Sequence, residues 1–318
     1  NVNCSNFMNN VATGFSSSVG GYGGGAIYAR YANVYSSTFE KNRAVYMNNI
    51  GTEGGSAIFI TSTLNIFDSV VKDNIAGARG ALFSSASGTM NVYRSNFTNN
   101  SANAGGAISS IGYVYVHDSN FINNTATGFG GGAIFADDQT FNRRLEIYNS
   151  NFIGNTAPEC CAIHNYYSKI TMIINNSTFI NNTDYKGGGG AIYGFGLKTT
   201  IDKTTFINNT PNAILTKVDN GAGSSISNSN FFADKIPMIS NKGQSISISN
   251  SKFNGNNVSN NYIAGSYTAD VIDPCPDLQG MIDSCTGNVL FLKNQTYSIN
   301  KTITFSKPIS IYGGFTET

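Results

Sequence analysis

The feature that most constrains this chain is an internal repeat with a period of about 27 residues. NVNCSNFMNN at position 1 aligns with NVYRSNFTNN at position 91, and the same frame recurs ten times. Each copy carries a large apolar residue: Phe7, Phe39, Val71, Phe97, Phe121, Phe152, Phe179, Phe206, Phe231 and Phe253. Three residues later stands Asp234 in one copy and Asn in the others: Asn10, Asn42, Asn74, Asn100, Asn124, Asn155, Asn182, Asn209 and Asn256. Such a period indicates a solenoid whose units pack on their neighbours.

The spacing within a copy favours strands over helices. A β-branched aliphatic residue lies five positions before each apolar marker, and Ser or Thr lies two positions before it. A second motif, GGAI, begins at positions 24, 105, 131 and 189, and suits a tight turn that enters a buried strand. Short β-branched runs without a 3.6-residue period predict strands that pair in parallel with those of the next copy. We therefore expect an all-β, right-handed, single-stranded parallel β-helix of about ten rungs, with Phe filling the bore and Asn at the corners.

The repeat predicts a division of the chain into three segments. Residues 1–257 form the β-helix repeats, residues 258–274 a linker, and residues 275–318 a short helix followed by strands near 289–292, 296–299 and 309–312. The last segment either closes the C-terminal end of the solenoid or begins the next array of a head-to-tail polymer. We favour the second interpretation. The chain opens in the middle of a copy, so we expect a mature or trimmed piece of a longer protein.

Composition narrows the classes of function. Lys and Arg number 19 against 18 Asp and Glu, so no strong field would steer the chain to nucleic acid. The 38 Phe and Tyr residues argue for a buried core and against disorder. No apolar run is long enough for a transmembrane helix, and the first twenty residues carry no export signal.

The paired GGAI and F-x-x-N motifs resemble the repeats of the polymorphic outer-membrane protein (Pmp) family and of adhesin-like β-helical surface proteins. The resemblance covers residues 1 to about 257 and rests on residues that build rungs. It implies surface display, adhesion and assembly of fibres or coats. The chain departs from exported members of the family because no C-terminal β-barrel signature is visible, which puts autotransport in doubt.

Five cysteines and a set of N-glycosylation sequons are candidates for disulfide formation and glycosylation. Cys275 and Cys285 flank the predicted helix and are the candidate disulfide, with two buried thiols as the alternative. Cys160 and Cys161 replace two glycines of GGAI, and their pairing stays open, while Cys4 could form an intermolecular bond. The candidate glycosylation sites each stand one residue before a repeat Asn: Asn99, Asn123, Asn181 and Asn208.

An enzyme of the polysaccharide-active β-helix type would need carboxylates that converge on one face. Asp137-Asp138 and Asn182-Thr183-Asp184 are the nearest approaches to such a motif, and their order along the chain is the reverse of the one expected. His117 stands where other copies have Tyr, and His164 follows CCAI in a loop. We expect no catalytic residue, no cofactor and no metal site. Tyr35, Tyr93 and Tyr148 could stack on sugars, although packing between rungs is the more usual role of such residues.

These features predict a structural component of an extracellular or cell-surface fibre that assembles head to tail. The alternative is a monomeric adhesin or carbohydrate-binding surface protein, and a polysaccharide-active enzyme comes third. The expected partners are other copies of the chain and a glycan or cell-surface receptor, with no nucleic acid.

Overall fold

The computed structural model describes most of residues 1–269 and two strands near the C-terminus. The described ranges are 1–14, 23–46, 54–85, 88–137, 143–160, 162–166, 170–194, 198–216, 223–233, 237–242, 245–258, 263–264, 267–269, 282, 289–293 and 310–315. Every element with described bounds is a β-strand, and the single described residue Ile282 is helical. Nowhere in them is there a helix of the length and apolarity that crossing a membrane would take.

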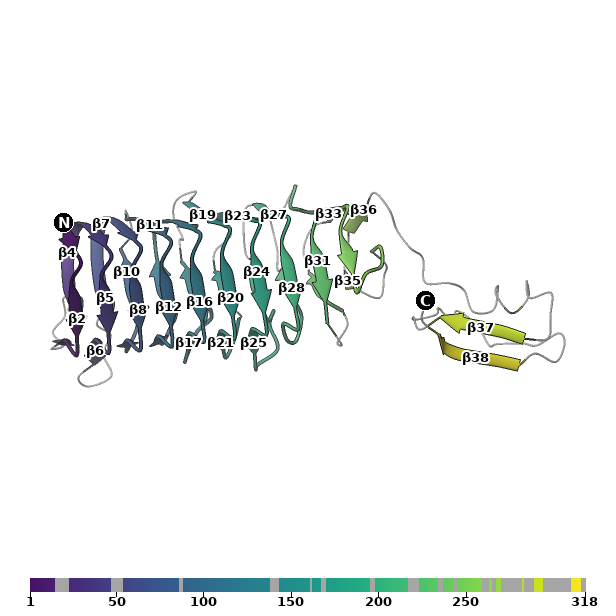
Figure 1. Cartoon of the computed structure of the whole chain (residues 1–318), viewed down its shortest axis with the longest axis horizontal. Helices are drawn as coiled ribbons and strands as arrows, with labels where there is room; N and C mark the ends of the chain where they lie inside the picture. The colour runs from purple at the N-terminus through teal and green to yellow at the C-terminus, as the bar shows by residue number, and fades with distance from the viewer. Residues whose placement is uncertain are drawn as a thin grey trace.

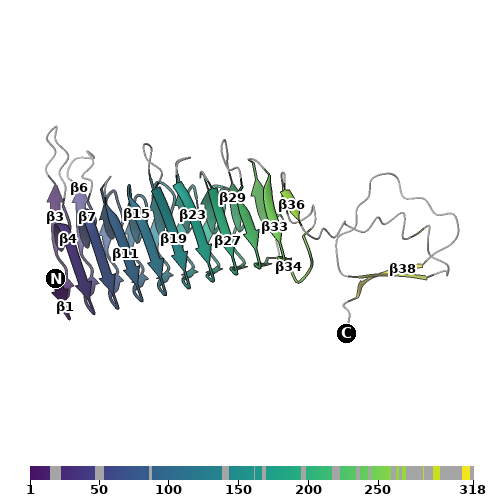
Figure 2. The same cartoon turned by 90° about the horizontal axis from the view of Figure 1, so that it is seen from above.

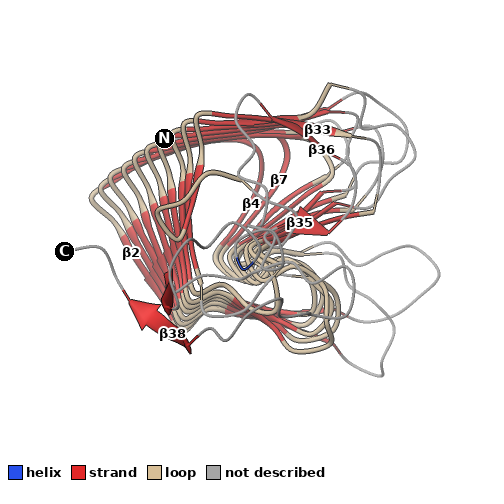
Figure 3. Ribbon diagram, turned by 90° about the vertical axis from the view of Figure 1, so that its right-hand side faces the viewer, coloured by secondary structure: helices blue, strands red, loops and turns tan. Residues whose placement is uncertain are grey.

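The strands form a parallel β-solenoid, in which about seven turns contribute a strand to every sheet. Successive turns lie side by side along the long axis in Figures 1 and 2, and Figure 3 looks along the stack. The parallel strands form four ladders, numbered 1 to 4, and within a turn that starts at Val2 the chain passes through ladders 1, 3, 4 and 2 in that order. Ladder 4 is confined to the first seven turns. This arrangement follows from the repeat, because each copy pairs with the next in register.

Ladders 1 and 2 belong to one sheet, because two long strands, β4 (Ile27–Tyr35) and β7 (Ile58–Phe67), run through both. Ladder 1 also contains β1 (Val2–Asn3), β11 (Thr89–Tyr93), β15 (Tyr113–His117), β19 (Arg143–Tyr148), β23 (Ile170–Asn175), β27 (Lys198–Asp202), β30 (Ser225–Ser227), β33 (Ile246–Ser249) and β36 (Tyr267–Ala269). Ladder 2 also contains β10 (Leu82–Ser84), β14 (Ile108–Ser110), β18 (Ile134–Ala136), β22 (Ile163–Asn165), β26 (Ile192–Gly194), β29 (Ile214–Thr216), β32 (Ile239–Asn241) and β35 (Ile263–Ala264).

Ladder 3 holds the apolar markers of the repeat and is a sheet of ten strands. Its members are β2 (Asn6–Met8), β5 (Thr38–Glu40), β8 (Val70–Lys72), β12 (Asn96–Thr98), β16 (Asn120–Ile122), β20 (Asn151–Ile153), β24 (Thr178–Ile180), β28 (Thr205–Ile207), β31 (Asn230–Phe232) and β34 (Lys252–Phe253). Ladder 4 is shorter: β3 (Val11–Gly14), β6 (Arg43–Tyr46), β9 (Ile75–Ala76), β13 (Ser101–Ala102), β17 (Thr125–Ala126), β21 (Thr156–Ala157) and β25 (Thr183–Asp184).

Residues in the left-handed region make the corners on either side of ladder 3. The corner after ladder 1 holds ten of them, with φ between 43° and 52°: Cys4, Ser36, Asp68, Arg94, Asp118, Asn149, Asn176, Lys203, Asn228 and Asn250. The corner before ladder 4 is built in the same way, for example by Asn123 with φ 54°. Asn and Asp tolerate this conformation better than other non-glycine residues, which explains their frequency at these positions.

The GGAI motif turns the chain tightly into ladder 2. Gly131 has φ +76°, and a Cβ on it would lie 2.3 Å from the carbonyl oxygen of Ile134. Only glycine fits such a position. The Ile of the motif then points into the bore, where Ile134 is fully buried.

The C-terminal part of the stack extends further than the repeat predicts. Strands β35 and β36 lie in the segment expected to be a linker, and they pair in parallel with β32 and β33. Sequence similarity to the repeat is lost there because backbone pairing needs no particular side chain. The predicted helix and strand 296–299 lie outside the described residues, apart from Ile282, which is buried. Further on, β37 (Val289–Lys293) and β38 (Ser310–Phe315) pair in parallel.

Candidate functional site

The Phe residues of ladder 3 form stacks along the axis of the bore. Phe121 and Phe152 stack with their centroids 4.8 Å apart and their planes 1° from parallel. Similar stacking joins Phe7 to Phe39 and continues without interruption from Phe97 to Phe253. Val71 separates the two stacks and is itself fully buried. Except beside Val71, each turn therefore makes the same aromatic contact with its neighbours.

The repeat Asn residues form a hydrogen-bonded ladder beside the Phe stacks. The backbone N–H and the Nδ2 of Asn100 both donate to Oδ1 of Asn124, at 3.0 and 2.9 Å. Asn124 Nδ2 in turn donates back to the carbonyl oxygen of Phe97 at 3.0 Å and onward to Asn155 Oδ1 at 3.0 Å. The same pattern runs from Asn10 through Asn42, Asn74, Asn100, Asn124, Asn155 and Asn182 to Asn209. Buried amides are thereby satisfied along the whole column.

The last predicted member of this ladder, Asn256, lies at a turn. Asn254 and Gly255 have φ values of 50° and 81°, so the chain turns back on itself. Asn256 is exposed, and its backbone exchanges hydrogen bonds with Phe253. Asp234, its counterpart in the preceding copy, lies outside the described residues.

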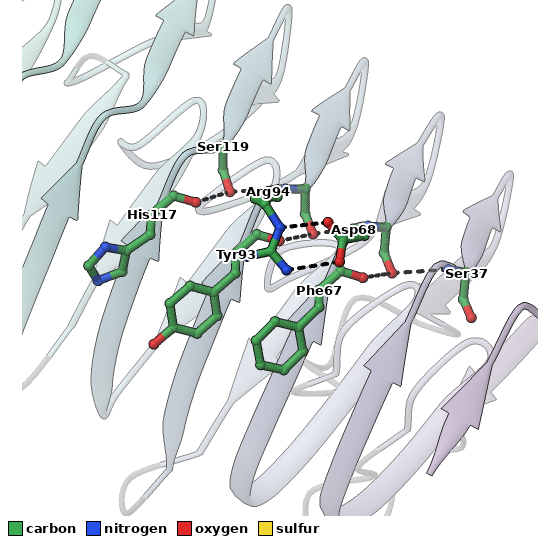
Figure 4. Close-up of polar contacts among 9 residues, drawn as sticks. Ser37, Phe67, Asp68, Tyr93, Arg94, His117 and Ser119 are labelled. Atoms are coloured by element: carbon green, nitrogen blue, oxygen red, sulfur yellow. Dashed lines mark hydrogen bonds and ion pairs between the residues drawn. The ribbon is translucent and has the colours of Figure 1, made fainter.

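The Ser and Thr residues of the repeat cap the corner after ladder 1. The backbone N–H of Ser95 donates to Ser119 Oγ at 3.1 Å, and Ser119 Oγ donates to the carbonyl oxygen of His117 at 2.7 Å. Figure 4 shows this chain of contacts from Ser37 to Ser119. Each hydroxyl thus serves as donor within its own turn and as acceptor for the preceding turn.

The candidate glycosylation sites Asn99, Asn123, Asn181 and Asn208 occupy a single column at the corner before ladder 4. All four are exposed and have φ between 50° and 55°. Gly154 holds the same position in another turn, so the position selects residues that tolerate a positive φ. The next residue is the ladder Asn, and the Ser or Thr after it begins a strand or bridge of ladder 4. Every part of the sequon therefore has a structural role of its own.

A second aromatic stack lies on the outer face of ladder 1. It runs through Tyr35, Phe67, Tyr93, His117 and Tyr148, with centroids 4.8 to 5.1 Å apart and planes within 17° of parallel. Figure 4 shows three of these rings beside the Arg94–Asp68 ion pair. The faces of the inner rings are covered by their neighbours, and only ring edges remain for contact with solvent. Stacking on a sugar needs an open ring face, so this geometry disfavours that role for Tyr93.

A comparison with family models, characterised proteins and solved structures finds no match.

The outer face of ladder 2 carries a covered apolar layer that the repeat does not reveal. Its residues point away from the bore yet are at most 7% exposed: Phe59, Phe83, Ser109, Phe135, His164, Tyr193 and Leu215. At Ser109, where the column lacks a large side chain, the Arg79 guanidinium lies 5.8 Å from the Phe83 ring and 5.7 Å from the Phe135 ring. The only sequence signal for this layer is the residue after each GGAI isoleucine.

A row of large apolar side chains that the sequence analysis did not predict lies on the outer face of ladder 3. It consists of the residues that follow the stacked Phe: Ile122, Ile153, Ile180, Ile207 and Phe232. The four Ile are partly exposed and Phe232 is 42% exposed. The row is one side chain wide, which is too narrow for a stable protein interface by itself.

The carboxylates of the described residues are dispersed and mostly paired with cations. Asp137 pairs with Arg79 at 3.0 Å, and Glu159 with Lys186 at 3.2 Å. Hydrogen bonds from Lys72 and Lys41 lower the pKa of Glu40. Within the described ranges no group of three or more His, Cys, Asp or Glu could hold a metal ion.

The remaining residues considered for catalysis have structural positions. Asp184 accepts hydrogen bonds from the backbone N–H groups of Lys186 and Gly187, at 2.8 and 3.1 Å. Burial raises its pKa. His117 belongs to the outer stack, and His164 is buried in the layer on ladder 2. Asp138, Cys161, Cys275 and Cys285 lie outside the described residues. Cys4 is exposed and Cys160 is buried.

Proposed function

We propose that the chain is a structural component of an extracellular or cell-surface fibre. The observation that carries this proposal is the unbroken Asn ladder, in which every buried amide from Asn42 to Asn182 bonds the turns on both sides. Stacked Phe rings run parallel to it. A body held together by the same contacts at each turn resists bending and shear along its whole length, as a fibre component must.

The proposal includes a right-handed winding and a count of ten rungs. The ten strands of ladder 3 support the count. The strong preference of parallel strand connections for a right-handed crossover supports the hand.

We further propose that copies join head to tail through strands β37 and β38. At the last strand of ladder 3, Phe253 exchanges backbone hydrogen bonds with Asn256, at 2.8 and 3.0 Å. Its outward backbone groups are thus occupied, and another copy cannot extend the ladder there. The β37–β38 pair, by contrast, repeats the pairing mode of the solenoid, with Leu290 opposite Ile311. Among the described residues, β37 and β38 pair only with each other. A two-stranded sheet gains stability from a further strand at its edge.

No enzymatic activity forms part of the proposal, because the described carboxylates are dispersed and do not converge on one face. The likeness of the motifs to Pmp repeats and adhesin-like surface proteins supports placement at a cell surface or outside the cell. A monomeric adhesin that binds a glycan or receptor is the second candidate, and the position of Tyr35 at the end of the outer stack, where it is 40% exposed, favours it.

Negative-stain microscopy and sedimentation velocity of the full chain over a range of concentrations test the fibre. We expect filaments of uniform width whose length grows with concentration. Ile311→Pro removes a backbone donor from β38 and should leave monomers. Asn123→Gly, at an exposed corner, is the matched control and should polymerise normally. A chain that stays monomeric at every concentration contradicts the proposal, and binding on a glycan array would then favour the adhesin.

A further inference from the structure

His164 is the most deeply buried titratable side chain in the layer that covers ladder 2. It extends from β22 away from the bore and is 4% exposed. Within the part of the chain that the structure describes, neither Nδ1 nor Nε2 has a hydrogen-bond partner. A buried polar group without a partner destabilises the folded state, so its presence in this position calls for a physical account.

The imidazole sits among three aromatic rings that meet it almost at right angles. The centroid distances are 4.9 Å to Tyr193, 5.2 Å to Phe135 and 5.3 Å to Tyr166, with interplanar angles of 77° to 89°. Gly130 closes the remaining side, since a Cβ on it would lie 2.0 Å from Nδ1. The surroundings therefore accommodate a neutral imidazole and offer no acceptor for a second ring proton.

Among the described residues, no charged group contacts the imidazole to stabilise its protonated form. The polar side chains of the neighbouring elements that lie nearest to it are those of Tyr166, Tyr193 and Cys160, and none of them is a carboxylate or a cation. Burial alone lowers the pKa of His164, to about 3.

We propose that His164 is an acid-sensitive latch whose protonation opens the coil over ladder 2 while the bore of the solenoid stays folded. Opening would expose the apolar faces of Phe135 and Tyr193 as a surface that is absent at neutral pH. The inference is independent of the fibre proposal, because it concerns the flank of the solenoid and not its ends.

The layer over ladder 2 should open more readily than the bore because the two are held by different contacts. The bore beside His164 is held by the stacked Phe152 and by Asn155, whose amide is fully hydrogen-bonded. The covering coil is rich in glycine around Gly130 to Gly132, and beneath Gly130 lies the imidazole of His164, which has no hydrogen-bond partner among the described residues. Regions of low local stability open first when a perturbation is applied.

The linkage between proton binding by His164 and opening of the coil fixes the sign of the pH dependence of opening. The closed form holds His164 neutral with a pKa of about 3, whereas an opened form would have the ordinary value near 6.5. Protons therefore bind preferentially to the opened form between these values. The opening equilibrium should rise by roughly a hundredfold from pH 7 to pH 4.

Hydrogen exchange of the full chain, measured by mass spectrometry and corrected for intrinsic rates, tests the latch. Peptides covering 128–137 and 158–166 should lose about a hundredfold of protection between pH 7 and pH 4. Bore peptides covering 119–124 and 150–155 should lose far less. Phe occupies the equivalent position in the adjacent turn at Phe135 and in an earlier turn at Phe83, so His164→Phe fits the column and should abolish the loss.

His117→Phe is the control, because Phe67 stands in the same outer stack, and this variant should respond to pH as the parent does. Three results would overturn the latch: unchanged protection in the parent, an equal loss in His164→Phe, or equal loss in bore and layer. If His164→Phe does not fold, the imidazole resonances of the unmodified chain decide. Titration of His164 below pH 5 supports the latch, and titration near 6.5 refutes it.

Discussion

The Arg79 guanidinium spans two turns of the solenoid to reach the Asp137 carboxylate, with 3.0 Å between Nη1 and Oδ2. The two residues are 58 positions apart in the sequence. Between them lies Ser109, over which Arg79 inserts between the rings of Phe83 and Phe135. A single cation thus replaces the aromatic ring that this turn lacks.

Replacing Arg79 by Ala should lower the free energy of unfolding by about 2 kcal/mol, because a half-buried ion pair and two cation–π contacts are lost. Adding Ser109→Phe to Arg79→Ala should recover much of this loss by completing the aromatic column. Urea unfolding of the single and double variants measures both effects. A double variant that is less stable than Arg79→Ala would contradict the packing account.

The Asn ladder provides a second test through two adjacent residues with opposite environments. Asn124→Ala removes the side-chain acceptor of Asn100 and the donor to Phe97, and should cost about 3 to 5 kcal/mol. Asn123→Gly should change stability by less than about 0.5 kcal/mol, since Gly154 adopts the same conformation. Chemical denaturation of the two variants measures both changes in stability. Equal losses in the two variants would contradict the assigned roles.

Lys203 adopts φ 50° at a corner where Asn is common. Asn tolerates the left-handed region better than Lys, so Lys203→Asn should raise stability by about 1 kcal/mol. Lys198→Asn removes the same charge from the start of strand β27 and is the control, with no gain expected. Thermal unfolding measures the difference, and a gain in both variants would assign the effect to charge instead.

Asp184 and Asp202 should respond to pH in opposite directions. Burial raises the pKa of Asp184, so its carboxylate destabilises the folded state above the ordinary carboxyl pKa, and this penalty disappears as pH falls. Asp184→Asn should therefore raise the denaturation midpoint at pH 7 and have little effect near pH 3.

Asp202 is the matched comparison, because a hydrogen bond from Ser227 is the main cause of its lowered pKa. Its stabilisation is present at neutral pH and is lost as pH falls through the folded-state pKa. Asp202→Asn should lower the midpoint at pH 7, and the two variants should converge with the parent in acid. Shifts of the same sign at pH 7 would contradict the assignment.

Much of the fold could be predicted from the repeat, because a parallel stack places each residue beside its counterpart in the next turn. Phe97 opposite Phe121 and Asn100 bonded to Asn124 follow directly from that register. The repeat could not predict the end of the stack, where β35 and β36 continue by backbone pairing and Asn256 lies at a turn.

The sequence by itself determined a parallel solenoid with Phe and Asn columns, since these contacts repeat with the period of the chain. Only the tertiary structure decided the layer over ladder 2, which places His164 among three rings and Arg79 beside Asp137. The layer side chains follow the GGAI isoleucine of successive turns, but the coil between ladder 4 and ladder 2 that covers them differs in length from turn to turn. Their partners are set by how the intervening coil folds over the strand, and no periodic pattern encodes that path.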